Sequence, residues 1–351
     1  MSVNHNDNKT DSERESVSES ESEDRITSKR ILIFGGSGSL GNCLVSRYYK
    51  NNKITVFSRD ECKHWKMSLT YNDEYSSNIS YVIGDIRDYN RVETTILRER
   101  PNIIIVASAM KHIDRSEYAV EECVQTNYNG ILNVVNCIER CNSTLTDLSC
   151  VVYVSTDKAC SPVNTYGISK ALGERVMVER SYYGTKPKFV CVRYGNVLNS
   201  NGSIIQILHS KGQNPEVKEF TLTHPEMTRF IQTLEQSVDL IEHSILSKNA
   251  ESGDIVIPRI TSMKVKDMID LFSEKYNKPV KITGLRPGEK MLESLINESQ
   301  STMMIEGEQY YYIKPPYKGL FKPEQSRDYN SHMNTMSKES LKDYLMQLNL
   351  L

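Results

Sequence analysis

From Arg30 onward the chain alternates short runs rich in β-branched residues with amphipathic stretches of helix length. This alternation is typical of a parallel sheet whose strands are joined by crossover helices. Strands are expected at Arg30–Phe34, Lys53–Ser58, Ile79–Gly84, Ile103–Ser108, Ser149–Ser155 and Lys188–Tyr194, and helices near residues 40–50, 60–70, 89–100, 119–141 and 165–183. The predicted fold class is therefore α/β, with a doubly wound parallel sheet.

The pattern changes at both ends of this alternating region. Residues 1–28 are mostly Ser, Glu, Asp and Asn, which cannot bury enough apolar surface to offset the entropy of ordering, so a disordered tail is expected there. Beyond residue 195 the rhythm loosens and prolines become frequent. We expect a sheet domain over residues 29–195 and a smaller mixed α/β region over 196–351 that covers the strand ends.

The composition of the chain indicates which kinds of partner and cellular setting to expect. The 351 residues carry a formal charge of −2, which disfavours nucleic acid, and no run of 18 apolar residues predicts a membrane span. The eight cysteines form no CxxC pair and the N-terminus has no apolar signal core, so a reducing, cytoplasmic setting is expected. Cys137 and Cys141 share a helix face, but without a nearby His they are predicted to be buried apolar residues, and no metal site is expected.

A glycine-rich loop, Gly35 to Gly41, follows the first strand directly and opens a helix. Glycines at positions 35, 38 and 41 permit a tight turn, a close approach of backbone amides to a pyrophosphate, and close packing of helix on strand. The loop predicts a dinucleotide site, and the residues expected to contact the cofactor are Gly35, Ser37, Gly38, Ser39, Leu40 and Gly41.

The end of the second strand distinguishes the two nicotinamide cofactors. A site for NAD normally has Asp or Glu there to bind the ribose hydroxyls, whereas this chain has Ser58 and Arg59. A guanidinium matches a 2′-phosphate in charge and geometry, with Ser58 and Lys63 as further donors, so the predicted cofactor is NADP. The alternative is that Arg59 is a solvated surface charge and Asp60 contacts the ribose.

Two later strand ends offer further cofactor contacts. Asp85 and Ile86 follow the third strand, where they could bracket the adenine. Ala107, Ser108 and Ala109 follow the fourth strand and are small enough for a cofactor to pass close to the backbone. Each of these segments could equally serve packing alone.

Tyr166 and Lys170 form a Y-x3-K pair at the start of a predicted helix, so both side chains lie on one face. The lysine ammonium, together with an oxidised nicotinamide ring, is expected to lower the pKa of the phenol, which near ~10 is too high for a base at neutral pH. Asp157 and Lys158 lie just upstream, where the fifth strand ends. Two opposite charges there indicate catalytic groups, with a strand-end ion pair as the alternative.

Nine motifs occur in order along the chain: GGSGSLG, SRDE, GDIRD, ASAMKH, TNYNG, STDKA-x6-YG-x2-K, RYGNV, MTRF and RPGEK. Together they resemble the inverting UDP-N-acetylglucosamine 4,6-dehydratases, which are extended short-chain dehydrogenase/reductase enzymes with a Rossmann sheet. The resemblance covers about residues 29–351. The segment Asp328–His332 is similar to the YNSH segment of the subgroup that makes N-acetyl-L-fucosamine-type sugars.

The resemblance implies an NADP-binding domain over residues 29–195 and a mainly substrate-binding region with a C-terminal arm over 196–351. In the family a hydride leaves C4 of the sugar, water is eliminated across C5 and C6, and the hydride returns to C6 while C5 is reprotonated on the opposite face. The implied roles are Lys158 as C5 base, Asp157 as acid for the C6 hydroxyl, and Tyr166 with Lys170 at the C4 hydroxyl. Ser155 and Thr156 would orient the sugar.

The resemblance also extends the binding sites. The added cofactor contacts are Lys111, Asn127 and Val197, and the added substrate contacts are Lys111, Asn196, Ser203, Thr223, Arg229, Arg286 and Glu289. Arg286 is the expected partner of the diphosphate, because a guanidinium binds phosphate bidentately. The chain has Ser200-Asn201-Gly202-Ser203 where the family usually has Ser-Arg-Gly-Ser, so one basic contact is missing.

Lys158 can act as a base only if its pKa falls well below ~10.4. Burial and the charges of Lys170 and Lys111 are expected to lower it, and a protonated Asp157 would remove an opposing charge and supply the acid. Asp157 and Lys158 are therefore predicted to point to different sides of the sugar.

The alternatives are a UDP-glucose 4,6-dehydratase, a UDP-hexose 4-epimerase, and a non-catalytic protein that keeps the NADP fold. The resemblance implies a homo-oligomer, with a hexamer as one form.

Overall fold

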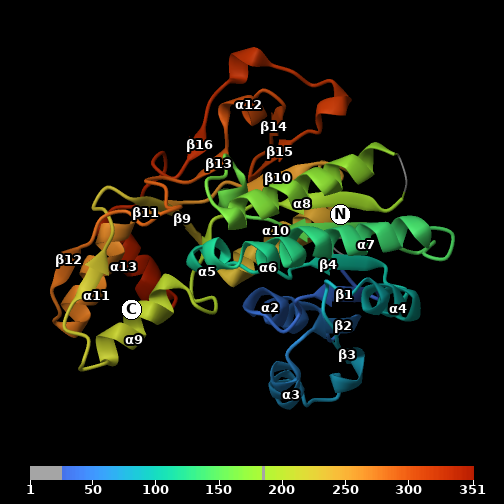
Figure 1. Cartoon of the computed structure of the whole chain (residues 1–351), viewed down its shortest axis with the longest axis horizontal. Coiled ribbons are helices and arrows are strands. Elements are labelled where there is room, and N and C mark those ends of the chain that lie inside the picture. Colours follow the sequence, from blue (N-terminus) through green and yellow to red (C-terminus); the bar gives the residue numbers. More distant parts are fainter. Residues whose placement is uncertain (1–25, 184–185) are drawn as a thin grey trace, which may run out of the picture.

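The computed structural model describes residues 26–183 and 186–351, and its centre is a nine-stranded sheet (Figure 1). The strand order is β14-β15-β10-β6-β5-β4-β1-β2-β3. The first six strands are β1 (Arg30–Phe34), β2 (Lys53–Ser58), β3 (Ile79–Ile83), β4 (Ile103–Val106), β5 (Cys150–Val154) and β6 (Lys188–Val192). They are all parallel, and the order reverses between β1 and β4, so the predicted doubly wound sheet is confirmed.

The helices between these strands agree with the predicted pattern. They are α2 (Ser39–Tyr48), α3 (Glu61–Thr70), α4 (Tyr89–Glu99), α5 (Ile113–Tyr118), α6 (Val120–Val124), α7 (Gly130–Arg140) and α8 (Thr165–Tyr182). The helix expected over residues 119–141 is instead α6 and α7 joined by a π-helical turn at Gln125–Asn129. Helix α5 was not predicted, since its six residues are too few for a helical period to show in the sequence.

The chain beyond residue 195 contributes to two regions. β10 (Ile255–Pro258) joins the main sheet parallel to β6, and β15 (Tyr310–Ile313) and β14 (Met304–Glu306) extend it in antiparallel fashion. Helix α10 (Leu234–Leu246) packs on this sheet. The boundary expected at residue 195 therefore does not separate the main sheet from the later segments.

The smaller region has its own core. It contains β7 (Asn196–Val197), β9 (Thr228–Gln232) and β11 (Ser262–Lys264) in one sheet, β8 (Phe220–Leu222) with β12 (Val280–Ile282) in another, and α9 (Ile204–Gln213), α11 (Val265–Tyr276) and α13 (Lys338–Gln347). β13 (Ser294–Ile296) pairs with β16 (Tyr329–Asn330), and the short α12 (Glu298–Ser301) follows β13. Figure 1 shows these elements beside the carboxyl ends of the central strands.

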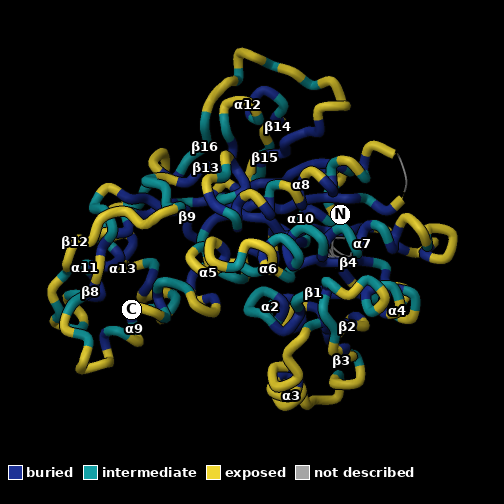
Figure 2. Tube along the Cα trace, viewed as in Figure 1, coloured by how far each residue is buried: buried dark blue, intermediate teal, exposed yellow. Residues whose placement is uncertain are grey.

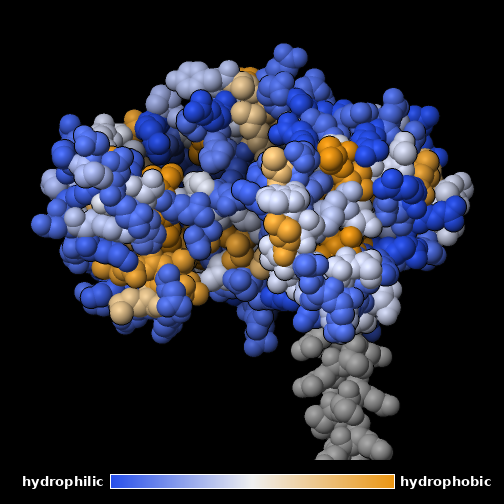
Figure 3. Space-filling model, turned by 90° about the horizontal axis from the view of Figure 1, so that it is seen from below, coloured by the Kyte–Doolittle hydropathy of each residue, from blue (hydrophilic) through white to orange (hydrophobic). Residues whose placement is uncertain are grey.

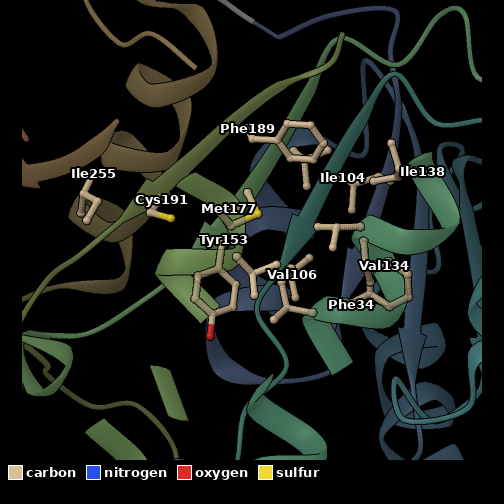
Figure 4. Packing of buried hydrophobic residues seen from close by; sticks show 14 of the residues in the cluster. Phe34, Ile104, Val106, Val134, Ile138, Tyr153, Met177, Phe189, Cys191 and Ile255 are labelled. Atoms are coloured by element: carbon tan, nitrogen blue, oxygen red, sulfur yellow. The ribbon is translucent and has the colours of Figure 1, made fainter. Parts of the chain in front are cut away.

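The main core lies between the central strands and the helices on both faces of the sheet. Figure 2 shows the middle strands of the sheet buried along most of their length, while the edge strand β3 and many of the loops are partly exposed. On one face Val134 and Met177 from helices pack against Phe34, Val106 and Tyr153 from strands (Figure 4). β4 and β5 are fully buried, and β1 is buried except at its first residue, which explains why their sequences show continuous apolar runs and not alternation.

The tail expected at residues 1–28 lies mostly outside the described residues. Of its last three positions, Ile26 is buried in the core and its carbonyl accepts a hydrogen bond from Asn52 Nδ2 at 2.9 Å. Ordered structure therefore begins before the expected boundary. No helix in residues 26–183 or 186–351 is long and apolar enough to cross a membrane. The face seen in Figure 3 is largely hydrophilic, with hydrophobic groups interspersed.

Candidate active site

The candidate cofactor residues gather at the carboxyl ends of β1 to β5, because parallel strands end at the same edge of the sheet. Gly35 has φ +82°, and a Cβ there would lie 2.7 Å from the backbone nitrogen of Ser108. A Cβ on Gly41 would lie 2.3 Å from the carbonyl oxygen of Gly36. Only glycine fits these two positions, so the tight turn and the close helix–strand packing expected from the sequence are present.

A chain of hydroxyl and imidazole groups joins the glycine loop to the end of β2. The oxygens of Ser37 and Ser58 are 2.7 Å apart, and Ser58 Oγ is 2.6 Å from Nε2 of His64. The sequence did not single out His64, whose side chain is buried on α3 and whose pKa is lowered by burial. In the sequence, a histidine on the buried face of a short helix cannot be told from an ordinary core residue. Its contact with Ser58 is seen only in the structure, where α3 lies against the end of β2.

Of the charged residues after β2, Asp60 is bound within the protein and Arg59 is largely exposed. Asp60 caps α3, because its Oδ1 accepts from the Lys63 backbone N–H at 3.0 Å and its Oδ2 lies 3.3 Å from Lys63 Nζ. Arg59 is 61% exposed and its Nη1 is 3.6 Å from Asp85 Oδ2. Asp60 is therefore committed to the helix terminus, whereas the guanidinium of Arg59 is mostly exposed at the edge of the site, with Asp85 as its ion-pair partner.

Asp85 and Ile86, the expected adenine pair, have partners within the protein. Asp85 Oδ2 accepts from Arg87 Nε at 2.9 Å. Burial opposes the charge of Asp85, but the hydrogen bonds and charge of Arg87 lower its pKa overall. Ile86 is buried in the main core.

The loop Ala107–Met110 after β4 is held by a buried amide. Asn127, in the π-helical turn, accepts from the Met110 backbone N–H at 2.8 Å and donates to the Met110 carbonyl at 3.0 Å and to Ser169 Oγ at 3.0 Å. The sequence predicted that Asn127 contacts the cofactor directly. In the structure both the oxygen and the nitrogen of its side-chain amide are bound to protein. Asn127 instead fixes the loop beside the cofactor site.

Tyr166 and Lys170 are both buried on α8, but the ammonium of Lys170 lies 3.9 Å above the ring of Tyr153. Burial lowers the pKa of Lys170 to about 7. Burial also raises the pKa of Tyr166 to about 12, although Lys158 and the Thr156 hydroxyl act in the opposite direction. Desolvation outweighs the nearby charges, and Lys170, whose ammonium lies over Tyr153, is not among the groups that lower the phenol pKa. The Lys170 part of the expectation is therefore wrong, and the part that relies on a nicotinamide ring stays a prediction.

Asp157 and Lys158 lie on a 3₁₀ turn at Asp157–Ala159, directly after β5. Lys158 Nζ donates to Asp157 Oδ1 at 3.0 Å and to Asn196 Oδ1 at 3.4 Å, and it lies 3.8 Å from Oε1 of Glu293. Burial lowers the pKa of Lys158, but the charges of Asp157 and Glu293 raise it overall. The expected lowering is thus wrong here, and the two residues form an ion pair in the absence of substrate.

Ser155 belongs to a buried ionic network rather than to the open site. Its hydroxyl donates to Glu174 Oε1 at 2.6 Å, and the same carboxylate binds the Arg193 guanidinium through Nε at 2.9 Å and Nη2 at 2.6 Å. Arg193 is fully buried and also donates to the carbonyl of Leu295 at 2.7 Å. The expectation that Ser155 orients the sugar is not supported, because its hydroxyl is used within the protein.

Several predicted substrate residues lie along the border between the two regions. Arg229 is buried and donates to the carbonyls of Thr228 and Lys290, at 2.7 and 2.9 Å. Arg286 is 70% exposed and its Nε donates to Glu289 Oε1 at 3.0 Å. Arg229 therefore braces the loop that carries the RPGEK motif, and Arg286 is free to reach a ligand once it leaves Glu289.

The remaining predicted residues are placed as follows. Lys111 Nζ lies 3.5 Å from Ser200 Oγ, Ser39 Oγ accepts from the Asn201 backbone N–H at 2.9 Å, and Thr223 Oγ1 contacts Met227 Sδ at 3.5 Å. Ser203 Oγ is buried without a hydrogen-bond partner among the described residues. Leu40 and Val197 pack at the edge of the core.

The cysteine pair has a neighbour that the sequence did not indicate. Glu93 of α4 lies next to Cys137 and Cys141 of α7, and one ligand atom from each lies within 4.8 Å of the others. Burial raises the pKa of Cys137 to about 12, with Cys141 and Glu93 adding to the effect. This favours the thiol form that a buried apolar residue would have.

The strand order, the glycine turn and the buried Tyr-x3-Lys pair beside it define a Rossmann enzyme of the extended short-chain dehydrogenase/reductase class. The solved structure of Pen from Bacillus thuringiensis has the same fold, with a TM-score of 0.82, 29% identity, and coverage of 93% of this chain and 99% of that one.

The model of the polysaccharide biosynthesis protein family matches residues 31–315, and the chain belongs to this family. It is 36% identical over 296 residues to the UDP-N-acetylglucosamine 4,6-dehydratase (inverting) of Campylobacter jejuni, covering 83% of this chain and 84% of that protein. It is 32% identical over 342 residues to a UDP-glucose 4-epimerase of Rickettsia bellii, covering 91% and 96%.

Proposed function

We propose that this chain is a nucleotide-sugar 4,6-dehydratase that inverts C5. It converts UDP-N-acetylglucosamine to a UDP-2-acetamido-2,6-dideoxy-4-keto-L-hexose for surface glycan synthesis, in the cytoplasm and as a homo-oligomer. The observation that carries the proposal is the Asp157–Lys158 ion pair at the end of β5, with Asp157 fully buried and Lys158 14% exposed, in the segment that also holds Tyr166 and Lys170. Elimination of water across C5 and C6 needs a base and an acid in addition to the group at C4. The similarity to the Campylobacter dehydratase supports the same reaction.

The residues present fit NADP as the cofactor. Gly35 and Gly41 permit the tight turn, because a Cβ at either position would strike the protein's own backbone, and such a turn at a helix N-terminus suits a pyrophosphate. Arg59 is exposed at the end of β2, next to Ser58, while Asp60 is engaged in capping α3 and is not free to bind ribose hydroxyls. The carboxylate neighbour of Arg59, Asp85, is held more closely by Arg87, at 2.7 Å against 3.6 Å, so the exposed guanidinium of Arg59 suits a 2′-phosphate. When bound, NADP would accept a hydride from C4 and supply it to C6 without being consumed.

At C4, Tyr166 would hold the hydroxyl and take its proton. Its raised pKa means that the phenol is protonated when no cofactor is bound, so an additional positive charge beside it is needed for it to act as a base. Lys170 would position the phenol from the next turn of α8. Thr156 is the residue proposed to orient the sugar, since its hydroxyl lies next to the phenol; that hydroxyl donates to Asp157 at 2.8 Å and would exchange this bond for one to the sugar.

At C5 and C6, the Asp157–Lys158 pair would supply both groups. Transfer of one proton within the pair, across the 3.0 Å between Nζ and Oδ1, gives a neutral amine and a carboxylic acid. Lys158 can then take the C5 proton while Asp157 gives its proton to the leaving C6 hydroxyl, so that water departs. The ion pair seen in this structure is the charge state that the elimination restores.

The substrate diphosphate would lie over the border of the smaller region. Arg286 is the proposed diphosphate ligand, and release from Glu289 would free its guanidinium for two phosphate oxygens. Lys111, Asn196, Ser203, Thr223, Arg229 and Glu289 are the other proposed substrate contacts. Glu289 would hold Arg286 in place until substrate arrives.

The second candidate is a UDP-hexose 4-epimerase, which the similarity to the Rickettsia proteins favours. Epimerisation at C4 needs Tyr166 and the cofactor but no base at C5. The Asp157–Lys158 ion pair would then have only a structural role.

Incubation of the protein with UDP-N-acetylglucosamine and with UDP-glucose in deuterated water, followed by NMR, tests both candidates. A dehydratase yields a 4-keto-6-deoxy sugar whose methyl signal is a singlet, because C5 carries solvent deuterium. In ordinary water, an Overhauser contact from H3 to the methyl group shows inversion, whereas a contact from H3 to H5 shows retention. A C4 epimer without deuterium at C5 would establish the epimerase, and no product from either sugar would refute both proposals.

A further inference from the structure

Glu293 is a buried carboxylate at the reacting centre to which the sequence motifs assign no role. It lies just before β13 and is 2% exposed. Its Oε1 is 3.8 Å from Lys158 Nζ and its Oε2 is 3.4 Å from Lys290 Nζ. Oε2 has no hydrogen-bond partner within residues 26–183 and 186–351. Because burying a carboxylate without full hydrogen bonding costs free energy, its position calls for a function.

The C-terminal arm fixes Glu293 in this place. Ser331 donates its backbone N–H to the Glu293 carbonyl at 2.8 Å, and its hydroxyl accepts from the Glu293 backbone N–H at 3.0 Å. The hydroxyl oxygens of Ser331 and Thr228 are 2.8 Å apart, which ties the arm to β9. β13 and β16, the strands that flank these two residues, lie side by side (Figure 1). The segment Asp328–His332 thus has a physical role, which is to hold this carboxylate.

Lys158 lies between two carboxylates on different elements. Asp157 is its neighbour on the 3₁₀ turn, and Glu293 approaches from β13. The other charged or titratable groups that face the ammonium are Arg229 of β9 and Tyr166 of α8. Lys290 balances Glu293 on its far side and donates to the Cys160 carbonyl at 3.0 Å. Asp157 alone would complete an ion pair with Lys158, so the second carboxylate is additional to it.

We propose that Glu293 is a positioning residue of the dehydration, which holds Lys158 and stabilises the ammonium formed when Lys158 takes the C5 proton. The inference rests on the proposed function. In the step concerned, the C5–H bond breaks and its proton goes to Lys158 Nζ. The electron pair forms the C5–C6 double bond, and the C6 hydroxyl leaves as water with the proton of Asp157. Asp157 faces the departing oxygen at that moment, and Glu293 remains as the carboxylate that faces the new ammonium.

The first test replaces Glu293 with Gln, which keeps its size and removes its charge, and compares it with Glu298→Gln, an exposed change five residues along the same segment. The falling, alkaline limb of the kcat–pH profile reports loss of the one proton that the Asp157–Lys158 pair shares. This limb should move to lower pH by about one unit in E293Q, because an opposite charge at ~4 Å raises the pKa of a lysine by that order. The kcat at the plateau should fall about tenfold, a loss of about 1.4 kcal/mol. KM should stay within about threefold, since the ammonium forms only after substrate has bound. E298Q should match the wild type.

A profile of E293Q that coincides with that of E298Q would overturn the proposal. So would a raised KM with unchanged kcat, because that result would make Glu293 a substrate-binding residue. Ser331→Ala, with Ser326→Ala as its control, provides a second variant that keeps the carboxylate but loosens its support. It should move the same limb in the same direction by a smaller amount, and a shift to higher pH would contradict the proposal.

A second measurement does not depend on turnover. Lys158 is methylated with formaldehyde and borohydride over a range of pH, and the modified peptide is quantified by mass spectrometry. In E293Q the midpoint of its reactivity should fall below that of the wild type, and an unchanged midpoint would overturn the inference. Absence of turnover in the wild type would instead contradict the proposed function, so the two failures are distinguishable.

Discussion

Replacing Glu174 with alanine should destabilise the whole protein, because this carboxylate is the counter-ion of the fully buried Arg193. The two side chains share two hydrogen bonds, and the Ser155 hydroxyl donates to the same carboxylate. The substitution leaves the Arg193 guanidinium with two neutral acceptors, the carbonyl of Leu295 and the amide oxygen of Gln300. Most of the loss in folding free energy comes from leaving a buried charge without a counter-ion, and less comes from losing the attraction within the pair.

The expected loss can be given a size. Removing one partner of a buried ion pair costs about 3–5 kcal/mol, whereas removing one partner of an exposed pair costs about 0–1 kcal/mol. With an unfolding entropy of about 2.1 cal/mol/K per residue, the 351 residues give about 0.7 kcal/mol/K, so Tm should fall by about 4–7 °C. The matched control is Asp147→Ala, which breaks the exposed pair with Arg30 and should lower Tm by about 1 °C or less.

Differential scanning calorimetry and urea unfolding of the wild type and both variants measure these effects. Glu174→Gln should lie between them, since the amide oxygen still accepts from Arg193 but carries no charge. The Leu295 carbonyl lies two residues after Glu293, so Glu174→Ala should also lower the rate of the proposed reaction. A loss below about 1 kcal/mol, equal to that of the exposed pair, would refute the reasoning that Arg193 depends on this counter-ion.

Two further predictions concern the cofactor site and the buried lysine. Arg59→Ala should weaken NADP binding about tenfold or more and leave NAD binding nearly unchanged, because a charge-assisted phosphate contact is lost. Calorimetric titration with NADP and with NAD measures both affinities, and Lys66→Ala, an exposed change on α3, is the control. An equal loss of affinity for NADP and NAD would contradict the assignment of Arg59 to the 2′-phosphate. Burial lowers the pKa of Lys170 from 10.5 to about 7, so between these values the unfolded chain binds more protons and stability rises with pH. Lys170→Met should therefore raise the free energy of unfolding most below pH ~7, and this gain should shrink towards pH ~10. Urea unfolding over this pH range measures the gain, and an equal gain at both ends would argue against a depressed pKa.

The first six strands of the main sheet could be predicted to within two residues because their apolar runs are local and uninterrupted. The glycine loop could be interpreted for the same reason, since Gly35 and Gly41 are needed by the backbone geometry of one short segment. The later strands were harder to predict. β10, β15 and β14 are three or four residues long, and which sheet they join depends on long-range pairing that no local pattern contains.

The candidate site shows the same division. Asp157, Lys158, Tyr166 and Lys170 lie within one stretch of sequence, so their grouping at the end of β5 could be foreseen. Their protonation states could not be foreseen, because these depend on burial and on a carboxylate more than 130 positions away. The uses of Ser155 and Asn127 within the protein were missed for the same reason, since their partners lie on α8 and in the loop after β4.

The sequence by itself determined the fold class, the family and the stretch of chain that would carry the chemistry, because each follows from residues close together along the chain. Only the tertiary structure decided that Glu293 faces Lys158, that the C-terminal arm holds it there, and that Ser155 serves a buried ionic network. These facts depend on distances of a few ångströms between segments far apart in sequence, and on the loss of water around them, which changes the free energy of every charge in the site.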